Sequence, residues 1–352
     1  MTKAKKLTKG QQRRIKANHD KKLQGKNAKN KDKVIWNDDD LAAPEGGVII
    51  SRFGQHADVE NEQGEIFRCN LRRSIASLVC GDKVLWRLGK ETQHSITGII
   101  EAVHDRDSVL SRPDVYDGVK PIAANISQIL IVSSVLPVFN SDIIDRYLVA
   151  AEQTGITPVI VLNKTDLLDS ISADEQENIA KQLKIYQEIG YQVLYASSKS
   201  RDGISELKTQ LSQHTSIFVG QSGVGKSTLV NALMPDLGLL TKEVSENSGL
   251  GQHTTTVARL YHFDEGGDLI DSPGIREFGL WHLTPEQVCH GFIEFSDFLG
   301  LCKFRDCKHQ TDPGCALIAA GENKKINPAR LASFQRILAS LNDNKLTSRF
   351  NN

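Results

Sequence analysis

The chain has no long apolar segment. None of its apolar runs approaches the roughly 18–20 residues that span a bilayer, and only 39% of its 352 residues are hydrophobic. The N-terminal region is too rich in lysine and arginine, and too poor in apolar residues, to be a secretory signal peptide. We therefore expect a cytoplasmic protein that contacts no membrane.

Cysteine is also scarce. Six cysteines in a chain of this length do not form a disulfide scaffold, and three of them crowd between residues 302 and 315. That crowding is typical of metal ligands in a reducing compartment. Cys69, Cys80 and Cys289 are scattered, and we expect them to be ordinary buried thiols.

The chain has a formal net charge of zero, because 43 basic side chains balance 43 acidic ones. The balance conceals a division, since residues 1–33 contain 13 Lys or Arg and two Asp, and the remainder has an excess of acidic side chains. Residues 1–35 show no apolar periodicity and are expected to form a disordered basic arm. Such an arm either binds nucleic acid or only aids solubility, and both interpretations stay open.

Short apolar alternations separated by turn residues follow the arm. Gly47–Ser51, Gly81–Trp86 and Ile96–Ile100 are examples, and about five such strands in a short segment are typical of a small β-barrel. We predict an OB-fold barrel over residues 36–112, with an SH3-like barrel as the alternative. Basic residues are interleaved with these strands, which favours RNA binding.

Residues 113–283 alternate between strand-like and helix-like segments. Apolar strands are predicted at Ile129–Val132, Pro158–Leu162 and Ser216–Val219, with helices at Asp142–Thr154 and 173–189. This alternation is typical of a parallel sheet covered by helices. Ligands of such α/β domains bind beyond the carboxyl ends of the strands, and the motifs of this chain occupy those positions.

The segment after Val219 has the pattern of a phosphate-binding loop, G-x4-G-K-S, between an apolar strand and a helical segment. It comprises Gly220, Gln221, Ser222, Gly223, Val224, Gly225, Lys226 and Ser227, followed by Thr228. Glycines let consecutive N–H groups point at phosphate oxygens, and the helix N-terminus adds its dipole. Lys226 is expected to reach the β- and γ-phosphates, and Ser227 to bind Mg²⁺.

The strand Pro158–Leu162 leads directly into Asn163-Lys164-Thr165-Asp166. The Asp166 carboxylate is suited to accept hydrogen bonds from the ring N–H and the exocyclic amine of guanine, a pair that adenine does not offer. Asn163 is expected to hold the loop, and Lys164 to cover the purine ring. These residues predict a site for GTP and GDP whose guanine motif precedes its phosphate loop.

Several further residues complete the expected nucleotide site. Ser197 and Ser198 follow another strand and are expected to present a backbone N–H to guanine O6. Asp271 is expected to support Mg²⁺ through water, and the N–H of Gly274 to contact the γ-phosphate. A Gly/Ser-rich stretch before three threonines at 254–256 resembles a switch loop, in which Thr255 or its neighbour Thr254 would complete the Mg²⁺ shell.

The residue after Asp271–Gly274 departs from the Ras-like arrangement. Ile275 stands where a glutamine would orient the attacking water, so intrinsic hydrolysis is expected to be slow. Our hypothesis is that His253, beside the threonines, substitutes for that glutamine. The alternative is a switch-loop histidine without a catalytic role.

The C-terminal residues 284–352 contain a Cys/His cluster. Cys302, Cys307, His309 and Cys315 supply three thiolates and an imidazole within 14 residues, and a structural Zn²⁺ takes four such ligands. We predict one structural zinc ion in a C-terminal helical domain, with three unrelated core cysteines as the alternative. Its last helix is predicted over Pro328–Leu341, where the apolar residues at 331, 334, 338 and 341 share one face.

Together, these motifs resemble the ribosome small-subunit-dependent GTPase family (RsgA, also called YjeQ or EngC), whose members are circularly permuted GTPases. The likeness rests on the barrel-like segment ahead of Asn163–Asp166, the loop Gly220–Thr228, the Gly-Gln-His-Thr-Thr-Thr stretch at 251–256, Asp271–Gly274 and the Cys/His cluster. Ser198 stands where many GTPases have alanine. The resemblance implies an OB-fold, a permuted GTPase domain and a zinc domain.

The resemblance also implies GTP hydrolysis stimulated by the small ribosomal subunit, a late role in that subunit's maturation, and rRNA binding. The permutation places the Asp271–Gly274 switch just before the zinc domain, so nucleotide state is expected to control association and release. We expect a monomer. Two alternatives stay open: a GTPase acting on tRNA or as a translation factor, and an RNA-binding scaffold that holds GTP as a structural ligand.

Overall fold

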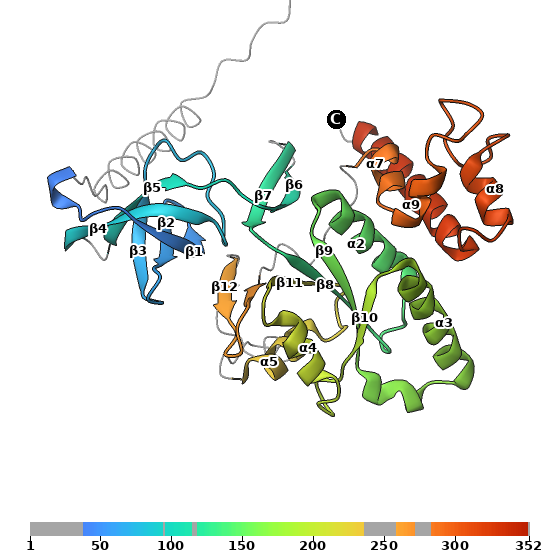
Figure 1. Ribbon diagram of the computed structural model, residues 1–352, viewed down its shortest axis with the longest axis horizontal. Coiled ribbons are helices and arrows are strands. Elements are labelled where there is room, and N and C mark those ends of the chain that lie inside the picture. The colour runs from blue at the N-terminus through green and yellow to red at the C-terminus, as the bar shows by residue number, and fades with distance from the viewer. Residues whose placement is uncertain (1–37, 94–95, 115–117, 236–257, 272–282, 351–352) are drawn as a thin grey trace, which may run out of the picture.

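The computed structural model describes residues 38–93, 96–114, 118–235, 258–271 and 283–350. Figure 1 shows the barrel strands on one side, a central α/β domain, and the C-terminal helices packed beside helix α2. Among these described residues, no helix is both long and apolar enough to cross a membrane. The basic arm, residues 1–35, lies outside them.

Five strands form the barrel, after a short helix η1 (Asp38–Asp40). They are β1 (Glu45–Phe53), β2 (His56–Glu60), β3 (Ile66–Leu71), β4 (Lys83–Gln93) and β5 (Ile96–Val103). The order is β1-β2-β3-β5-β4, and β4 closes back on β1. β3 and β5 run parallel, while the other neighbours are antiparallel. This closed five-stranded ring confirms the OB-like barrel.

Some arginines of the barrel form ion pairs with carboxylates of the same barrel. Arg106 donates two hydrogen bonds to the fully buried carboxylate of Asp82, at 2.6 and 2.9 Å. Arg68 pairs with Asp58 at 2.9 Å. A buried carboxylate needs such a partner, so Arg106 stabilises the fold, and the RNA-binding expectation rests on the other cations.

The central sheet has the predicted α/β organisation. Its strands are β8 (Gln128–Ser134), β9 (Thr157–Asn163), β10 (Gln192–Tyr195), β11 (Thr215–Val219), β12 (Arg259–His262) and β13 (Asp268–Asp271). They follow the order β10-β9-β8-β11-β13-β12, in which only β12 is antiparallel to its neighbour within this domain.

Helices cover both faces of this sheet, which explains why every residue of β8 is buried. Ile129 and Ile131 share a core with α2 (Ser141–Thr154) and α3 (Ala173–Ile189). Leu130 and Val132 share another with α4 (Ile204–Leu211) and α5 (Lys226–Leu233). The alternation of side chains along a strand assigns neighbouring residues to opposite cores.

Helix α2 has clear end signals. The Asn140 side chain accepts from the backbone N–H groups of Asp142 and Ile143, and Gly155 ends the helix with φ +68°. Asn140 follows directly on the loop after β8. The start of α2 is therefore fixed next to the carboxyl edge of the sheet.

Two further features join the barrel to the α/β domain. The hairpin of β6 (Val109–Asp114) and β7 (Gly118–Ala124) contributes Leu110 and Ala123 to an α/β core. Strand β12 also pairs with β1, which makes one continuous sheet. Beside this junction, His262 contacts Asp268 and the barrel's Glu60, both at 2.7 Å.

The C-terminal residues form a small helical domain with its own core. Its elements are α7 (Pro285–His290), η5 (Ile293–Phe298), α8 (Ala316–Glu322) and α9 (Pro328–Phe350). The predicted last helix is confirmed, and it continues beyond Leu341. Phe292 and Phe295 stack in this core, and Phe334 packs edge-to-face against both. The core also contains Val149 and Ala150 of α2.

A buried ionic cluster secures α9 against α2. Arg330, only 2% exposed, donates to Asp145 of α2 and, at 2.6 Å, to Glu294 of η5. Its guanidinium lies 4.4 Å from the centre of the Phe292 ring, and Tyr186 donates to the same Asp145 at 2.7 Å. Helix α2 is thus shared between the α/β domain and the C-terminal domain.

Candidate guanine-nucleotide and metal sites

The predicted nucleotide motifs meet at one edge of the central sheet. Asn163 ends β9, while Ser197 and Gly220 come after β10 and β11, and these strands are parallel members of one sheet. Asp271 ends β13, whose register with β11 places Asp268 opposite Thr215. Because carboxyl ends of parallel strands share an edge, Asp271 lies near the start of the phosphate loop.

The phosphate loop curls tightly after β11. Gly220 has φ +142°, and a Cβ there would lie 2.1 Å from the carbonyl oxygen of Val132, so only glycine fits. Lys226 begins α5 and folds back, since its Nζ donates to the carbonyls of Gly220 and Gln221 at 2.6 and 2.7 Å. The ammonium therefore sits over the loop, where phosphates bind in sites of this kind.

The guanine motif and the phosphate loop are joined by direct hydrogen bonds. Asn163 is fully buried, and its Nδ2 donates to the carbonyl of Val224 at 2.9 Å. Its buried Oδ1 has no hydrogen-bond partner among the residues that the structure describes. Lys164 Nζ donates to the carbonyl of Gly223 at 2.7 Å. These hydrogen bonds hold the two segments together, although their order in the chain is the reverse of that in Ras-like GTPases.

Lys164 also makes a contact that the sequence did not indicate. Its Nζ donates to the carbonyl of Leu136, in the loop between β8 and α2, at 2.7 Å. Ser134 donates to the same carbonyl at 2.8 Å. No motif marks this loop, and only its position after a buried strand could have suggested that it borders the site.

Asp166 is oriented by the segment after β10. Ser197 is fully buried, and its Oγ donates to Asp166 Oδ1 at 2.6 Å. The same Oγ accepts from the backbone N–H groups of Lys199 and Ser200, at 3.2 and 3.1 Å. Its side chain therefore shapes the turn and leaves the second Asp166 oxygen for another donor, a role that no sequence motif indicates.

The remaining predicted groups of the nucleotide site fall into two sets. Ser198, Ser227 and Asp271 are half-buried near the same edge, and Thr228 is exposed. His253, the threonines at 254–256, Gly274 and Ile275 lie outside the described residues.

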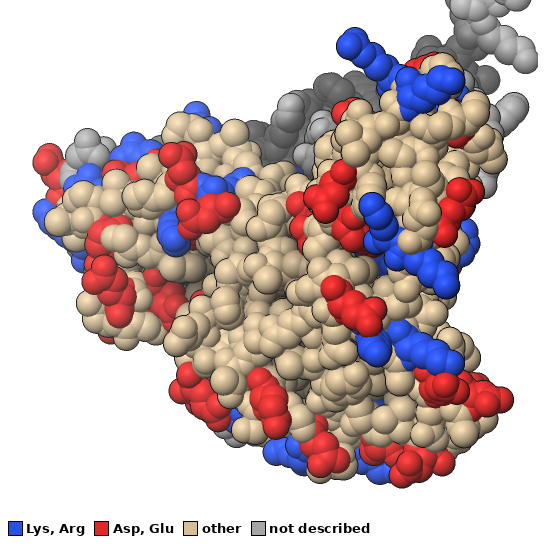
Figure 2. All heavy atoms as spheres, turned by 45° about the vertical axis from the view of Figure 1, so that its right-hand side comes forward, with Lys and Arg blue, Asp and Glu red and all other residues tan. Residues whose placement is uncertain are grey.

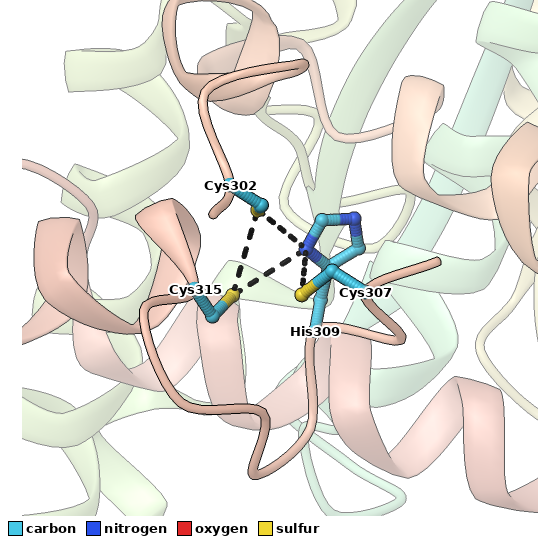
Figure 3. Close-up of side chains that lie close together, drawn as sticks. All are labelled: Cys302, Cys307, His309 and Cys315. Carbon is cyan, nitrogen blue, oxygen red and sulfur yellow. Dashed lines mark hydrogen bonds between the residues drawn. The ribbon is translucent and has the colours of Figure 1, made fainter. Parts of the chain in front are cut away.

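The predicted Cys/His cluster comes together in the C-terminal domain (Figure 3). His309 Nδ1 lies 3.5, 3.6 and 3.4 Å from the sulfurs of Cys302, Cys307 and Cys315. All four potential ligand atoms lie within 4.8 Å of one another. Such a convergent set can hold a metal ion, and it excludes three unrelated core cysteines.

The surroundings of the cluster suit metal binding. Burial lowers the pKa of His309, which favours the neutral imidazole that a metal ion requires. The backbone N–H of Ala316 donates to Cys302 Sγ at 3.3 Å, which fixes the position of that sulfur. The scattered Cys69 and Cys289 are buried as expected, and burial raises the pKa of each to about 12.

Comparisons with known proteins agree with this geometry. Residues 103–281 match the RsgA GTPase family. The chain is 59% identical over 339 residues to the small ribosomal subunit biogenesis GTPase RsgA of Dickeya dadantii, covering 96% of this chain and 95% of that protein.

Two solved structures share the architecture. YjeQ from Thermotoga maritima superposes with a TM-score of 0.67 at 32% identity, covering 85% of this chain and 99% of that one. The circularly permuted GTPase YloQ gives a TM-score of 0.67 at 26% identity, covering 88% and 99%. The fold of this chain is therefore that of a circularly permuted GTPase.

Proposed function

The chain belongs to the RsgA GTPase family, and we propose that it hydrolyses GTP during late maturation of the small ribosomal subunit. The observation that carries the nucleotide part of this proposal is the bond from Asn163 to the phosphate-loop carbonyl of Val224. This hydrogen bond joins the guanine motif and the phosphate loop into one site.

Within this site, we assign the groups that bind GTP. Asp166, oriented by Ser197, accepts from the guanine ring N–H and amine, and Lys164 covers the base. The backbone N–H groups of residues 220–228 and the ammonium of Lys226 bind the phosphates. Mg²⁺, when bound with GTP, neutralises charge that develops on the phosphates, and Ser227, Thr255 and Asp271 are the residues that would hold it.

Hydrolysis requires a group that orients the attacking water, and Ile275 cannot supply it. His253 is our candidate. Replacing His253 by alanine should reduce multiple-turnover phosphate release while GTP affinity stays unchanged. Equal turnover by the two proteins, with and without small subunits, would remove His253 from the mechanism.

We propose a single structural zinc ion in the Cys/His cluster. Ideal tetrahedral Zn²⁺ with sulfur at about 2.3 Å and nitrogen at about 2.0–2.1 Å requires sulfur–nitrogen separations of about 3.5 Å. The three observed separations, 3.4 to 3.6 Å, agree with that value. The set supplies four protein ligands, which is the composition of a closed structural site.

The partner that we propose is the small ribosomal subunit, which the protein binds through the subunit's rRNA. The subunit stimulates GTP hydrolysis, and the GTP-bound and GDP-bound proteins differ in their affinity for it. A relative with 59% identity carries small-subunit biogenesis in its name, and the barrel and basic arm offer RNA-binding chemistry. Such a role also places the protein in the cytoplasm.

Phosphate release measured with small subunits, large subunits or tRNA tests this assignment. Stimulation by small subunits alone is the expected result. Stimulation by tRNA instead would favour a translation factor, and no turnover under any condition would favour a scaffold that holds GTP as a structural ligand.

A further inference from the structure

The metal loop, defined as Leu301–Lys308, combines features that the metal itself does not need. Leu301 is 67% exposed and Phe304 is 46% exposed, and both belong to the small set of large apolar side chains exposed in the described part of the chain. Lys303 Nζ lies 5.4 Å from the centre of the Phe304 ring. Two large apolar groups exposed on one short loop indicate an interaction site.

The charges of this loop differ from those of the barrel. Arg68, Arg72 and Arg106 of the barrel pair with carboxylates of the same domain. Within the described ranges, no carboxylate pairs with Lys303, Arg305 or Lys308. Three cations without an anionic partner beside an exposed aromatic ring are complementary to a polyanion that also carries flat apolar groups.

The space next to the loop has the size for such a ligand. A cleft of about 1010 Å³ is lined by Phe304, Arg305 and Lys308 and by the buried Phe334 and Leu338 of α9. Glu286 and His290 of α7 line it as well. Pockets of roughly 300–1,000 Å³ accommodate small organic ligands, so one nucleotide fits.

On the face shown in Figure 2, basic and acidic side chains are interspersed around a broad uncharged area. Attraction of a nucleic acid to that face therefore has to come from local groups of cations. A metal ion bound by the four ligands would stiffen the metal loop, because Cys302 and Cys307 flank Phe304 in the sequence. A pre-organised ring loses little conformational entropy on binding.

From these observations we propose that the metal loop binds an unpaired RNA nucleotide, with its base stacked on Phe304 and its phosphates on Lys303, Arg305 and Lys308. Proteins read single-stranded RNA by stacking splayed bases on aromatic side chains. The inference rests on the proposed function, since it names a contact that this protein would make with the small subunit's RNA.

The test measures binding of the full-length, metal-loaded protein to a labelled single-stranded RNA of about ten nucleotides and to a duplex of equal length. Phe304→Ala should weaken single-strand binding roughly tenfold and leave duplex binding unchanged. Phe304→Trp keeps an aromatic ring and should bind the single strand as tightly as the wild type. Arg305→Gln with Lys308→Gln should make the dependence of log K on log salt shallower by about 1.4. Lys324→Gln with Lys325→Gln, on the turn before α9, is the matched charge control and should change little.

A photoreactive aromatic residue at position 304, irradiated in the complex with small subunits, identifies the partner. A crosslink to rRNA is expected. A crosslink to a ribosomal protein, or wild-type RNA affinity for Phe304→Ala, overturns the inference. The basal GTP turnover and the metal content of each variant, measured in parallel, should equal those of the wild type. If the wild-type protein shows no stimulation by small subunits, the proposed function fails whatever the result at Phe304.

Discussion

Replacing Arg330 by methionine should destabilise the C-terminal domain more than any change at a surface ion pair. The guanidinium is 2% exposed and serves Asp145, also 2% exposed, and Glu294. Methionine keeps most of the stem's volume but leaves both carboxylates without their cation. Removing one partner of a buried pair costs about 3–5 kcal/mol, a large fraction of the stability of a domain.

The effect should depend on pH. Burial raises the pKa of Asp145, and the charge of Arg330 opposes that rise. Without Arg330 the folded-state pKa rises further above its unfolded value, so the variant loses stability at neutral pH and recovers part of it as the carboxyl becomes protonated on acidification. Asp145→Asn in the same chain should likewise recover part of the loss, because the uncompensated charge disappears.

Urea unfolding followed by release of the bound metal to a chelating dye reports on this domain. With a slope of about 2 kcal/mol per molar urea, a loss of about 4 kcal/mol lowers the midpoint by about 2 M. Arg336→Met is the matched control, because Arg336 pairs with Asp142 across the same two helices but is 54% exposed. It should cost no more than about 1 kcal/mol. Equal midpoints for the two variants would refute the reasoning.

Three further predictions concern the other sites. Asp166→Asn should weaken GTP binding and favour the xanthine nucleotide, whose C2 carbonyl accepts from the new amide; competition binding measures the exchange, and unchanged preference would contradict the assignment. The pKa of His262 is raised to about 9, chiefly by its hydrogen bond to Asp268 and further by Glu60. The protonated imidazole therefore stabilises the fold fully below pH 6.5, and this stabilisation disappears as the pH rises through 9. In His262→Gln, unfolding midpoints should lose this dependence. Cys307→Ser should reduce bound metal below one equivalent and lower the melting temperature, whereas full occupancy would show that Cys307 is not a ligand.

The motifs of the expected nucleotide and metal sites stand out in the sequence because their signals are local. Glycines at fixed spacing after a buried strand predict a phosphate loop, and four ligands within a short segment predict a metal cluster. The α/β sheet followed from apolar strands that are buried on both faces. The barrel type needed the β3–β5 pairing and ring closure, which depend on register between distant segments.

What the sequence did not reveal depends on contacts between distant residues. Arg330 lies on the same face of α9 as Phe334, Ile337 and Leu341, at helical spacing, yet a lone arginine is ordinarily read as solvent-exposed. Its partner Asp145 is 185 positions away. The sharing of α2 between two cores, and the contact of Lys164 with Leu136, escaped prediction for the same reason.

The shared helix alters how nucleotide state can reach the C-terminal domain. The sequence suggested one connection, along the chain after Asp271. Helix α2 provides a second, because it starts beside the loop that Lys164 contacts and carries Asp145, the partner of Arg330, on its second turn. If the chain connection alone transmits the signal, Arg330→Met leaves the ratio of subunit affinities in the GTP-analogue and GDP states unchanged. Transmission through α2 predicts a smaller ratio in Arg330→Met than in Arg336→Met, measured by co-sedimentation with small subunits.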